Sequence, residues 1–235
     1  RIIMILEICA NSYQSAVNAN IAGAHRIELC SEISVGGTTP SYGLLKKVMA
    51  DIDIPVHVLI RPRSGNFTYS GKEFDIMKEN IRLCKDLGCA GIVSGVLHED
   101  NSIDIKRTSE LIELSKPMSF TFHRAFDVVS KPKEALLQLL NLGVDRLLTS
   151  GHEEKAEDGI DLLIELQKLA KNKITILPGS GINSENCIHF KNNGFTEIHS
   201  SASKIISSRT HSYFGNTPQI VSDIDRIKNI LDSIA

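Results

Sequence analysis

Short apolar runs rich in β-branched residues recur along the chain, and each is followed by an amphipathic stretch. The runs begin near positions 2, 26, 56, 90, 118, 145, 174 and 196, so successive starts lie between 22 and 34 residues apart. This spacing accommodates one strand and one helix per unit. The pattern therefore predicts eight strands that alternate with helices.

The stretches between the runs carry the periodicity and the end signals of helices. We expect helices over 12–22, 42–50, 72–87, 103–115, 132–142, 157–170 and 184–193, and a last helix over 220–234. Glycine stands where four of these helices should end, at Gly23, Gly88, Gly143 and Gly194.

Eight strand–helix units without a linker or a low-complexity tract favour one α/β domain over 1–235, a (β/α)8 TIM-type barrel. A doubly wound sheet is the alternative. The turn after the first strand reads Cys9-Ala10-Asn11-Ser12 and lacks the Gly-rich fingerprint of that fold. The barrel is therefore the predicted fold, and no nucleotide cofactor is expected.

Apolar and ionisable side chains alternate in several predicted strands, as in Leu6-Glu7-Ile8 and Ile27-Glu28-Leu29. Side chains alternate between the two faces of a strand. The apolar set of alternate residues should therefore face the helices, and the other set should face the barrel interior. The ionisable residues that this places inside are Glu7, Glu28, His57, Arg61, His123, Glu197 and His199.

Ionised groups inside a barrel are costly unless they are paired. One interpretation is an internal network of Glu–Arg salt bridges. The other is a functional pocket, because most of these groups are expected toward the carboxyl ends of the strands, where barrel enzymes place their chemistry. The pocket is favoured, although both can coexist. Its candidate catalytic residues, expected to converge at one end, are Glu7, Glu28, Arg61, His123 and His199.

Two loops at the same end suggest an anion site. Arg61-Pro62-Arg63 supplies two guanidinium groups suited to carboxylate or phosphate. Gly179-Ser180-Gly181 follows the seventh strand, where bare backbone N–H groups beside a helix N-terminus form the usual barrel phosphate site. Ser201 adds a hydroxyl after the eighth strand, and Asp127 is expected to orient His123 or Arg124, or else to be a solvated charge or a helix cap.

The same Glu-x-Cys pattern ends the first two strands, at Cys9 and Cys30. Two inward thiolates suit a soft ion such as Cu(I) or Zn²⁺. The alternatives are that each Cys is a small buried apolar residue, or that the layers of the barrel hold the sulfurs too far apart. Cys84, Cys89 and Cys187 are interpreted as packing residues, and His25, His98, His152, His189 and His211 as lone surface histidines.

The overall composition excludes several classes of protein. The 26 Lys and Arg against 28 Asp and Glu give a net charge of −2, with no basic run of the kind that nucleic-acid binding needs. No stretch reaches the roughly 18 apolar residues that cross a bilayer. Five cysteines without metal-finger spacing fit reduced thiols in a reducing compartment.

The chain resembles the copper homeostasis protein CutC family. The segments that carry the resemblance run in order from the first strand to the eighth: 6–9 (LEIC), 26–31 (RIELCS), 36–41 (GGTTPS), 54–57 (IPVH), 60–63 (IRPR), 121–127 (TFHRAFD), 148–151 (LTSG), 178–182 (PGSGI) and 197–202 (EIHSSA). The chain departs from the family at Ser64, where a second Gly is common, and in the variable segment after Ala202.

The resemblance implies a TIM-type barrel, a cytoplasmic location, association into homodimers or larger homo-oligomers, and a role in copper handling. Cu(I) would be bound through Cys9 and Cys30. The residues themselves favour a second hypothesis, an enzyme acting on a small anionic or phosphorylated molecule. His123 and Glu7 or Glu28 would exchange protons while Arg61 and Arg63 hold the anion.

Overall fold

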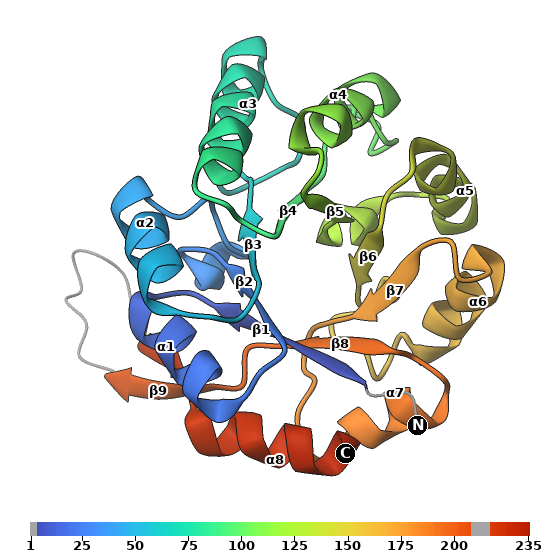
Figure 1. Ribbon diagram of the computed structural model, residues 1–235. Helices are drawn as coiled ribbons and strands as arrows, with labels where there is room; N and C mark the ends of the chain where they lie inside the picture. The colour runs from blue at the N-terminus through green and yellow to red at the C-terminus, as the bar shows by residue number, and fades with distance from the viewer. Residues whose placement is uncertain (1–3, 208–216) are drawn as a thin grey trace.

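Eight parallel strands form the centre of the molecule and helices surround them (Figure 1). The computed structural model describes residues 4–207 and 217–235. The strands are β1 (Ile5–Ala10), β2 (Arg26–Leu29), β3 (Val56–Leu59), β4 (Gly91–Ser94), β5 (Ser119–Phe122), β6 (Arg146–Thr149), β7 (Thr175–Pro178) and β8 (Glu197–Ser200). Their order is β7-β6-β5-β4-β3-β2-β1-β8, and a parallel bridge between Gly179 and His199 brings the two edges together. The predicted TIM-type barrel is confirmed.

The surrounding helices lie close to their predicted positions. They are α1 (Tyr13–Ala22), α2 (Tyr42–Asp51), α3 (Gly71–Asp86), α4 (Ile105–Ser115), α5 (Pro132–Leu142), α6 (Ile160–Ala170), α7 (Cys187–Asn192) and α8 (Ile224–Ile234), with 3₁₀ turns η1 (Ile33–Val35) and η2 (Arg124–Val128). None of the described helices is long and apolar enough to cross a membrane.

The helix ends follow from local chemistry. Ser70 and Glu73 form a capping box at the start of α3, and Ser12 caps α1 through the Ser15 N–H. Gly23 and Gly143 adopt the left-handed conformation that ends α1 and α5.

Two segments differ from the prediction. The helix expected over 184–193 is shortened to α7, because Asn183 and Asn186 hold the preceding residues in a turn: the Asn183 N–H donates to the Asn186 side chain. Residues 203–207 and 219–222, the latter expected partly as helix, form the antiparallel strands β9 (Ser203–Ser207) and β10 (Gln219–Ser222). His211 and the start of the first predicted strand, at positions 2 and 3, lie outside the described residues.

The core divides as the strand parity predicts. Leu6, Ile8 and Ile27 are fully buried in the apolar layer between strands and helices. A second, smaller apolar cluster is formed by strand residues that face the barrel interior, and it consists of Cys9, Cys30, Leu59 and Val93. The barrel interior therefore combines this apolar group with the ionisable residues described below.

Candidate functional site

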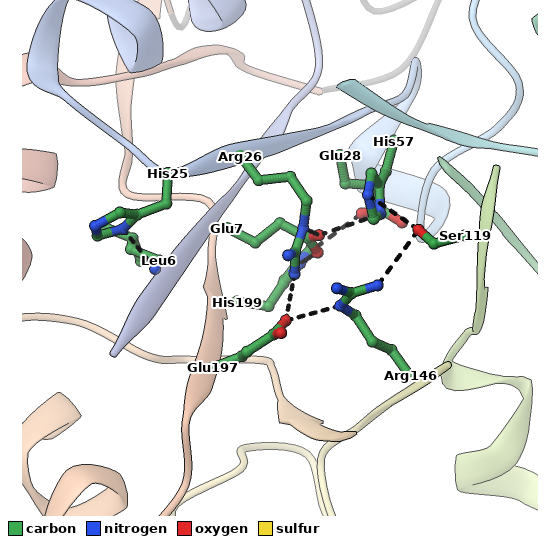
Figure 2. A network of polar contacts seen from close by, with 10 residues as sticks. All are labelled: Leu6, Glu7, His25, Arg26, Glu28, His57, Ser119, Arg146, Glu197 and His199. Atoms are coloured by element: carbon green, nitrogen blue, oxygen red, sulfur yellow. Dashed lines mark hydrogen bonds and ion pairs between the residues drawn. The ribbon is translucent and has the colours of Figure 1, made fainter. Parts of the chain in front are cut away.

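An ion-pair network fills the part of the barrel interior where the strands begin (Figure 2). Arg26 donates to Glu7 and, at 2.6 Å, to Glu197. Arg146 donates to the same Glu197 oxygen at 2.9 Å and to the Ser119 hydroxyl at 3.3 Å. Arg26, Ser119, Arg146 and Glu197 are each the first residue of their strand. The expected internal salt-bridge network therefore exists, and it lies away from the carboxyl ends of the strands.

This network fixes the charge of its members. Burial raises the pKa of Glu7, but the charge of Arg26 and a hydrogen bond with His199 outweigh burial and hold that pKa well below its usual value. Burial lowers the pKa of His57 to about 4, so this histidine is neutral at physiological pH. Two carboxylates thus face two guanidinium groups, which is the pairing that buried charges require.

His199 connects this network to the carboxyl ends of the strands. Its Nδ1 lies 2.8 Å from Glu7 Oε1 and its Nε2 lies 3.6 Å from Glu28 Oε2. Burial lowers the pKa of His199, but the hydrogen bond with Glu7 and the charge of Glu28 raise it overall. The pKa of Glu28 is raised, chiefly by burial.

The two inward thiols meet above this histidine. The Sγ atoms of Cys9 and Cys30 lie 3.7 Å apart, so the barrel layers do not separate them. Cys9 is paired in register with Glu28 on the neighbouring strand, and ligand atoms of Cys9, Glu28 and His199 all lie within 4.8 Å of one another. The hydrogen bond with Cys30 and burial raise the pKa of Cys9 well above 9, so its thiol is protonated in the metal-free protein.

A cavity of about 500 Å³ opens at the carboxyl ends of the strands. Nine of the predicted site residues line it: Cys9, Glu28, Arg61, His123, Asp127, Ser180, Gly181, His199 and Ser201. Glu7 belongs to the ion-pair network and Cys30 to the small apolar cluster, and neither lines the cavity. The predicted convergence at one end therefore holds for Glu28, Arg61, His123 and His199 but not for Glu7.

The two arginines of the Arg61-Pro62-Arg63 segment point to different places. Arg61 is buried and donates to the carbonyls of Val35, Gly37 and Gly65 at 2.7–2.9 Å. Arg63 instead pairs with Glu73 at 2.5 Å on α3 and does not line the cavity. The expectation of two guanidinium groups in one mouth was wrong, because β3 ends at Leu59 and the alternation of faces does not continue through Pro62.

Asp127 orients Arg124 rather than His123. Its carboxylate accepts from Arg124 Nε at 2.7 Å, from the Ser150 hydroxyl at 3.0 Å, and from Thr149. The side chain thereby ties the turn η2 to the loop after β6. Asp127 lines the cavity, but these donors already occupy its oxygens.

The Gly179-Ser180-Gly181 turn closes the barrel. The Gly179 N–H donates to the Thr149 carbonyl, and a Cβ at Gly179 would lie 2.6 Å from a Leu148 methyl, which would have to move. Ser180 donates its hydroxyl to the Glu154 carbonyl at 2.6 Å. Because α7 begins only at Cys187, the expected helix N-terminus does not adjoin this turn. The Ser201 hydroxyl lies 3.2 Å from that of Ser203.

Two residues of the barrel interior and its mouth, Arg146 and Phe67, were not predicted from the sequence. Arg146 was counted only as part of an apolar run, although an Arg at the start of such a run was a signal for an internal ion pair. Phe67 lines the cavity and lies outside the strands, where strand parity gives no information.

Comparisons with known proteins identify the family. The family model described as the CutC family matches residues 4–204. A human copper homeostasis protein cutC homolog is 47% identical over 199 residues, which cover 84% of this chain and 73% of the human one. A CutC family protein from Photorhabdus laumondii is 44% identical over 225 residues, covering 95% of this chain and 90% of the relative. The chain therefore belongs to the CutC family.

Solved structures agree with this assignment. The crystal structure of a CutC protein from Streptococcus agalactiae matches with a TM-score of 0.79 and 34% identity, covering 84% of this chain and 98% of the other. An aldolase matches with a TM-score of 0.63 at 12% identity, covering 81% of this chain and 83% of the aldolase, and this likeness concerns the barrel fold alone.

Proposed function

We propose that this protein serves copper homeostasis by binding Cu(I) through Cys9 and Cys30. The observation that carries the proposal is the 3.7 Å separation of their Sγ atoms at the carboxyl ends of β1 and β2. Thiolates are soft ligands and favour Cu(I) over the harder divalent ions. Both thiols are buried and free, so neither is committed to a disulfide.

Neighbouring groups support the same proposal. Glu28 and His199 bring a carboxylate and an imidazole within 4.8 Å of the Cys9 sulfur, and imidazole is also a good copper ligand. Cys9, Glu28 and His199 line the mouth cavity, which gives an ion a route from solvent. The relatives from human and mouse carry copper homeostasis in their names, which agrees with this chemistry.

The wider setting belongs to the same proposal: one domain over 1–235, a cytoplasmic location, and a homodimer or larger homo-oligomer. Support for self-association comes from β9, where Ile205 and Ile206 are 63% and 58% exposed. Light scattering on the purified chain tests the oligomer, and a single cooperative unfolding transition tests the single domain.

A competition titration with a chromogenic Cu(I) chelator under reducing conditions tests the binding proposal. We expect Cys9→Ser and Cys30→Ser each to weaken Cu(I) binding by more than about tenfold. A loss of about tenfold in metal affinity is the lower end for removing a residue that only supports a metal ligand, and a ligand itself should matter more. Cys187→Ser is the matched control, because Cys187 is also buried but lies on α7, where its thiol contacts the Ser184 carbonyl. Equal Cu(I) affinities for all three variants would show that Cys9 and Cys30 are not ligands.

A further inference from the structure

Two buried nitrogen atoms at the mouth cavity lack a hydrogen-bond partner. They are Arg61 Nε and His123 Nε2. Both residues line the cavity, and each is only 5% exposed. Buried polar groups in folded proteins are almost always paired, because leaving one unpaired costs about 1–3 kcal/mol. Two such atoms in one cavity therefore indicate that an acceptor is supplied from outside the chain.

The environment of His123 makes its free nitrogen a donor. Its Nδ1 accepts a hydrogen bond from the Ala125 N–H at 3.2 Å, so the proton of the neutral ring is on Nε2. Burial and the charge of Arg61 lower the pKa of His123 to about 3, so the ring is neutral at physiological pH. The buried Nε2 of His123 is therefore an N–H donor rather than a base.

Arg61 presents a second N–H group and an unbalanced charge. Its guanidinium donates to the carbonyls of Val35, Gly37 and Gly65 and also approaches the Tyr69 hydroxyl, which is a neutral group. Among the described residues, no carboxylate forms an ion pair with Arg61, whereas Arg124, which also lines the cavity, is paired with Asp127. A buried cation without a counter-charge is costly, and an anionic ligand would supply one.

Phe67 forms an apolar wall beside both donors. Its ring centroid lies 5.1 Å from the Arg61 guanidinium carbon and 5.1 Å from the His123 ring centroid. Leu59 and Ile33 also line the cavity. An apolar pocket of about 500 Å³ with a few convergent polar groups is typical of a small-molecule site.

We propose that the mouth cavity binds a small organic anion through a carboxylate or phosphate oxygen that accepts hydrogen bonds from Arg61 Nε and His123 Nε2. This ligand is distinct from the Cu(I) of the proposed function. The apolar wall favours an organic anion over a bare inorganic ion, since only the former has carbon atoms to bury. In this account Arg61 and His123 are binding residues, and Arg63 takes no part.

Calorimetric titration of the full chain, kept metal-free with a chelator, tests this proposal with two probes. Inorganic phosphate represents a phosphoryl group and pyruvate represents a small organic carboxylate. Saturable binding of one probe at one site per chain is expected, and the probe that saturates identifies the group that the donors recognise.

Two substitutions of His123 separate its two nitrogen atoms. Asn in His123→Asn keeps an acceptor where Nδ1 meets the Ala125 N–H but has no atom at the position of Nε2. Gln in His123→Gln keeps a donor near Nε2 and gives up that acceptor. We expect His123→Asn to weaken probe binding roughly 10- to 100-fold, as usual for a hydrogen bond to a charged group. His123→Gln should retain most of the affinity.

Several results would overturn the proposal. One is a His123→Asn variant that binds the probe as tightly as the parent. Another is an equal loss of probe affinity in His123→Asn and His123→Gln, which would show that the effect comes from the turn at Ala125 and not from the Nε2 donor. Absence of saturable binding by both probes also contradicts it. Arg61→Lys, which keeps the charge but loses Nε, is a second test if His123→Asn does not fold. An unchanged probe affinity of Arg61→Lys would also contradict the proposal. Because copper is excluded and Cys9 and Cys30 are intact, failure here leaves the Cu(I) proposal standing.

Discussion

His199 Nδ1 lies 2.8 Å from Glu7 Oε1, and this contact joins the two halves of the barrel interior. Below it, Glu7 belongs to the ion-pair network with Arg26, Glu197 and Arg146. On its other side, Nε2 of the same imidazole approaches Glu28, and the ring also lies near the Cys9 sulfur (Figure 2 labels His199 and both glutamates). The structural network thereby holds the imidazole in place beside the proposed copper ligands.

Removing Arg26 should destabilise the fold strongly. Arg26→Met leaves Glu7 and Glu197 without their shared cation, and breaking a buried ion pair from one side costs about 3–5 kcal/mol. Urea unfolding of parent and variant at pH 7 measures this difference. Arg82→Met is the control, because Arg82 pairs with Glu79 on the exposed surface of α3 and its loss should change the unfolding free energy by less than about 0.5 kcal/mol. Equal effects of the two substitutions would contradict the network's role.

Stability should fall in acid because of Glu7. Arg26 and His199 depress the pKa of Glu7 in the folded protein. The ionised carboxylate therefore stabilises the fold at pH values above the unfolded pKa of about 4.3, and this stabilisation is lost as the pH falls toward the pKa of the folded protein. Glu7→Gln cannot titrate, so its unfolding free energy should be lower at pH 7 and should decline less between pH 5 and pH 3. Parallel pH profiles for parent and variant would show that Glu7 is not the group responsible.

Cu(I) affinity should rise with pH. The Cys9 pKa is raised well above 9 by its hydrogen bond with Cys30 and by burial, so a metal ion must displace a proton from this thiol throughout the physiological range. The apparent affinity should increase by about tenfold per pH unit for each proton released. Chelator competition between pH 6 and pH 8.5 measures the slope. A flat profile is incompatible with binding by a thiol that starts protonated.

Gly95 should be required for the position of His123. A Cβ at this position would lie 2.8 Å from two atoms of the His123 ring, so Gly95→Ala must displace the imidazole. The expected loss of stability is about 1–3 kcal/mol, as for other overpacked sites. Gly43→Ala is the control, since nothing lies within 4 Å of its added Cβ on α2 and the change should be neutral or slightly stabilising. Thermal unfolding of both variants distinguishes the two positions.

The fold was predictable because alternation within the strands is a strong physical signal. Leu6 and Ile8 had to meet the helices, which placed Glu7 inside, and the structure agrees. The hairpin of β9 and β10 was missed because Ile220 and Val221 also fit a helical pattern. For short apolar runs the two periodicities are not distinguishable.

Strand parity was the most reliable guide to the site. Glu28, His199 and Cys9 were placed correctly because each lies on a strand whose apolar residues clearly face the helices, which leaves these three side chains facing the interior. Arg63 was misplaced because β3 ends at Leu59 and the alternation of faces, which still places Arg61 in the cavity, does not continue past Pro62. Contact between the Cys9 and Cys30 sulfurs depends on the register of β1 against β2, which residue spacing alone does not determine.

X-ray absorption at the copper edge, on the Cu(I)-loaded protein, tests the central claim most directly because it counts the sulfur atoms around the ion. The account predicts two sulfur ligands in the parent and in Cys187→Ser, and one fewer in Cys30→Ser. A first coordination shell of nitrogen and oxygen alone, or the same sulfur count in Cys30→Ser as in the parent, would contradict binding through Cys9 and Cys30.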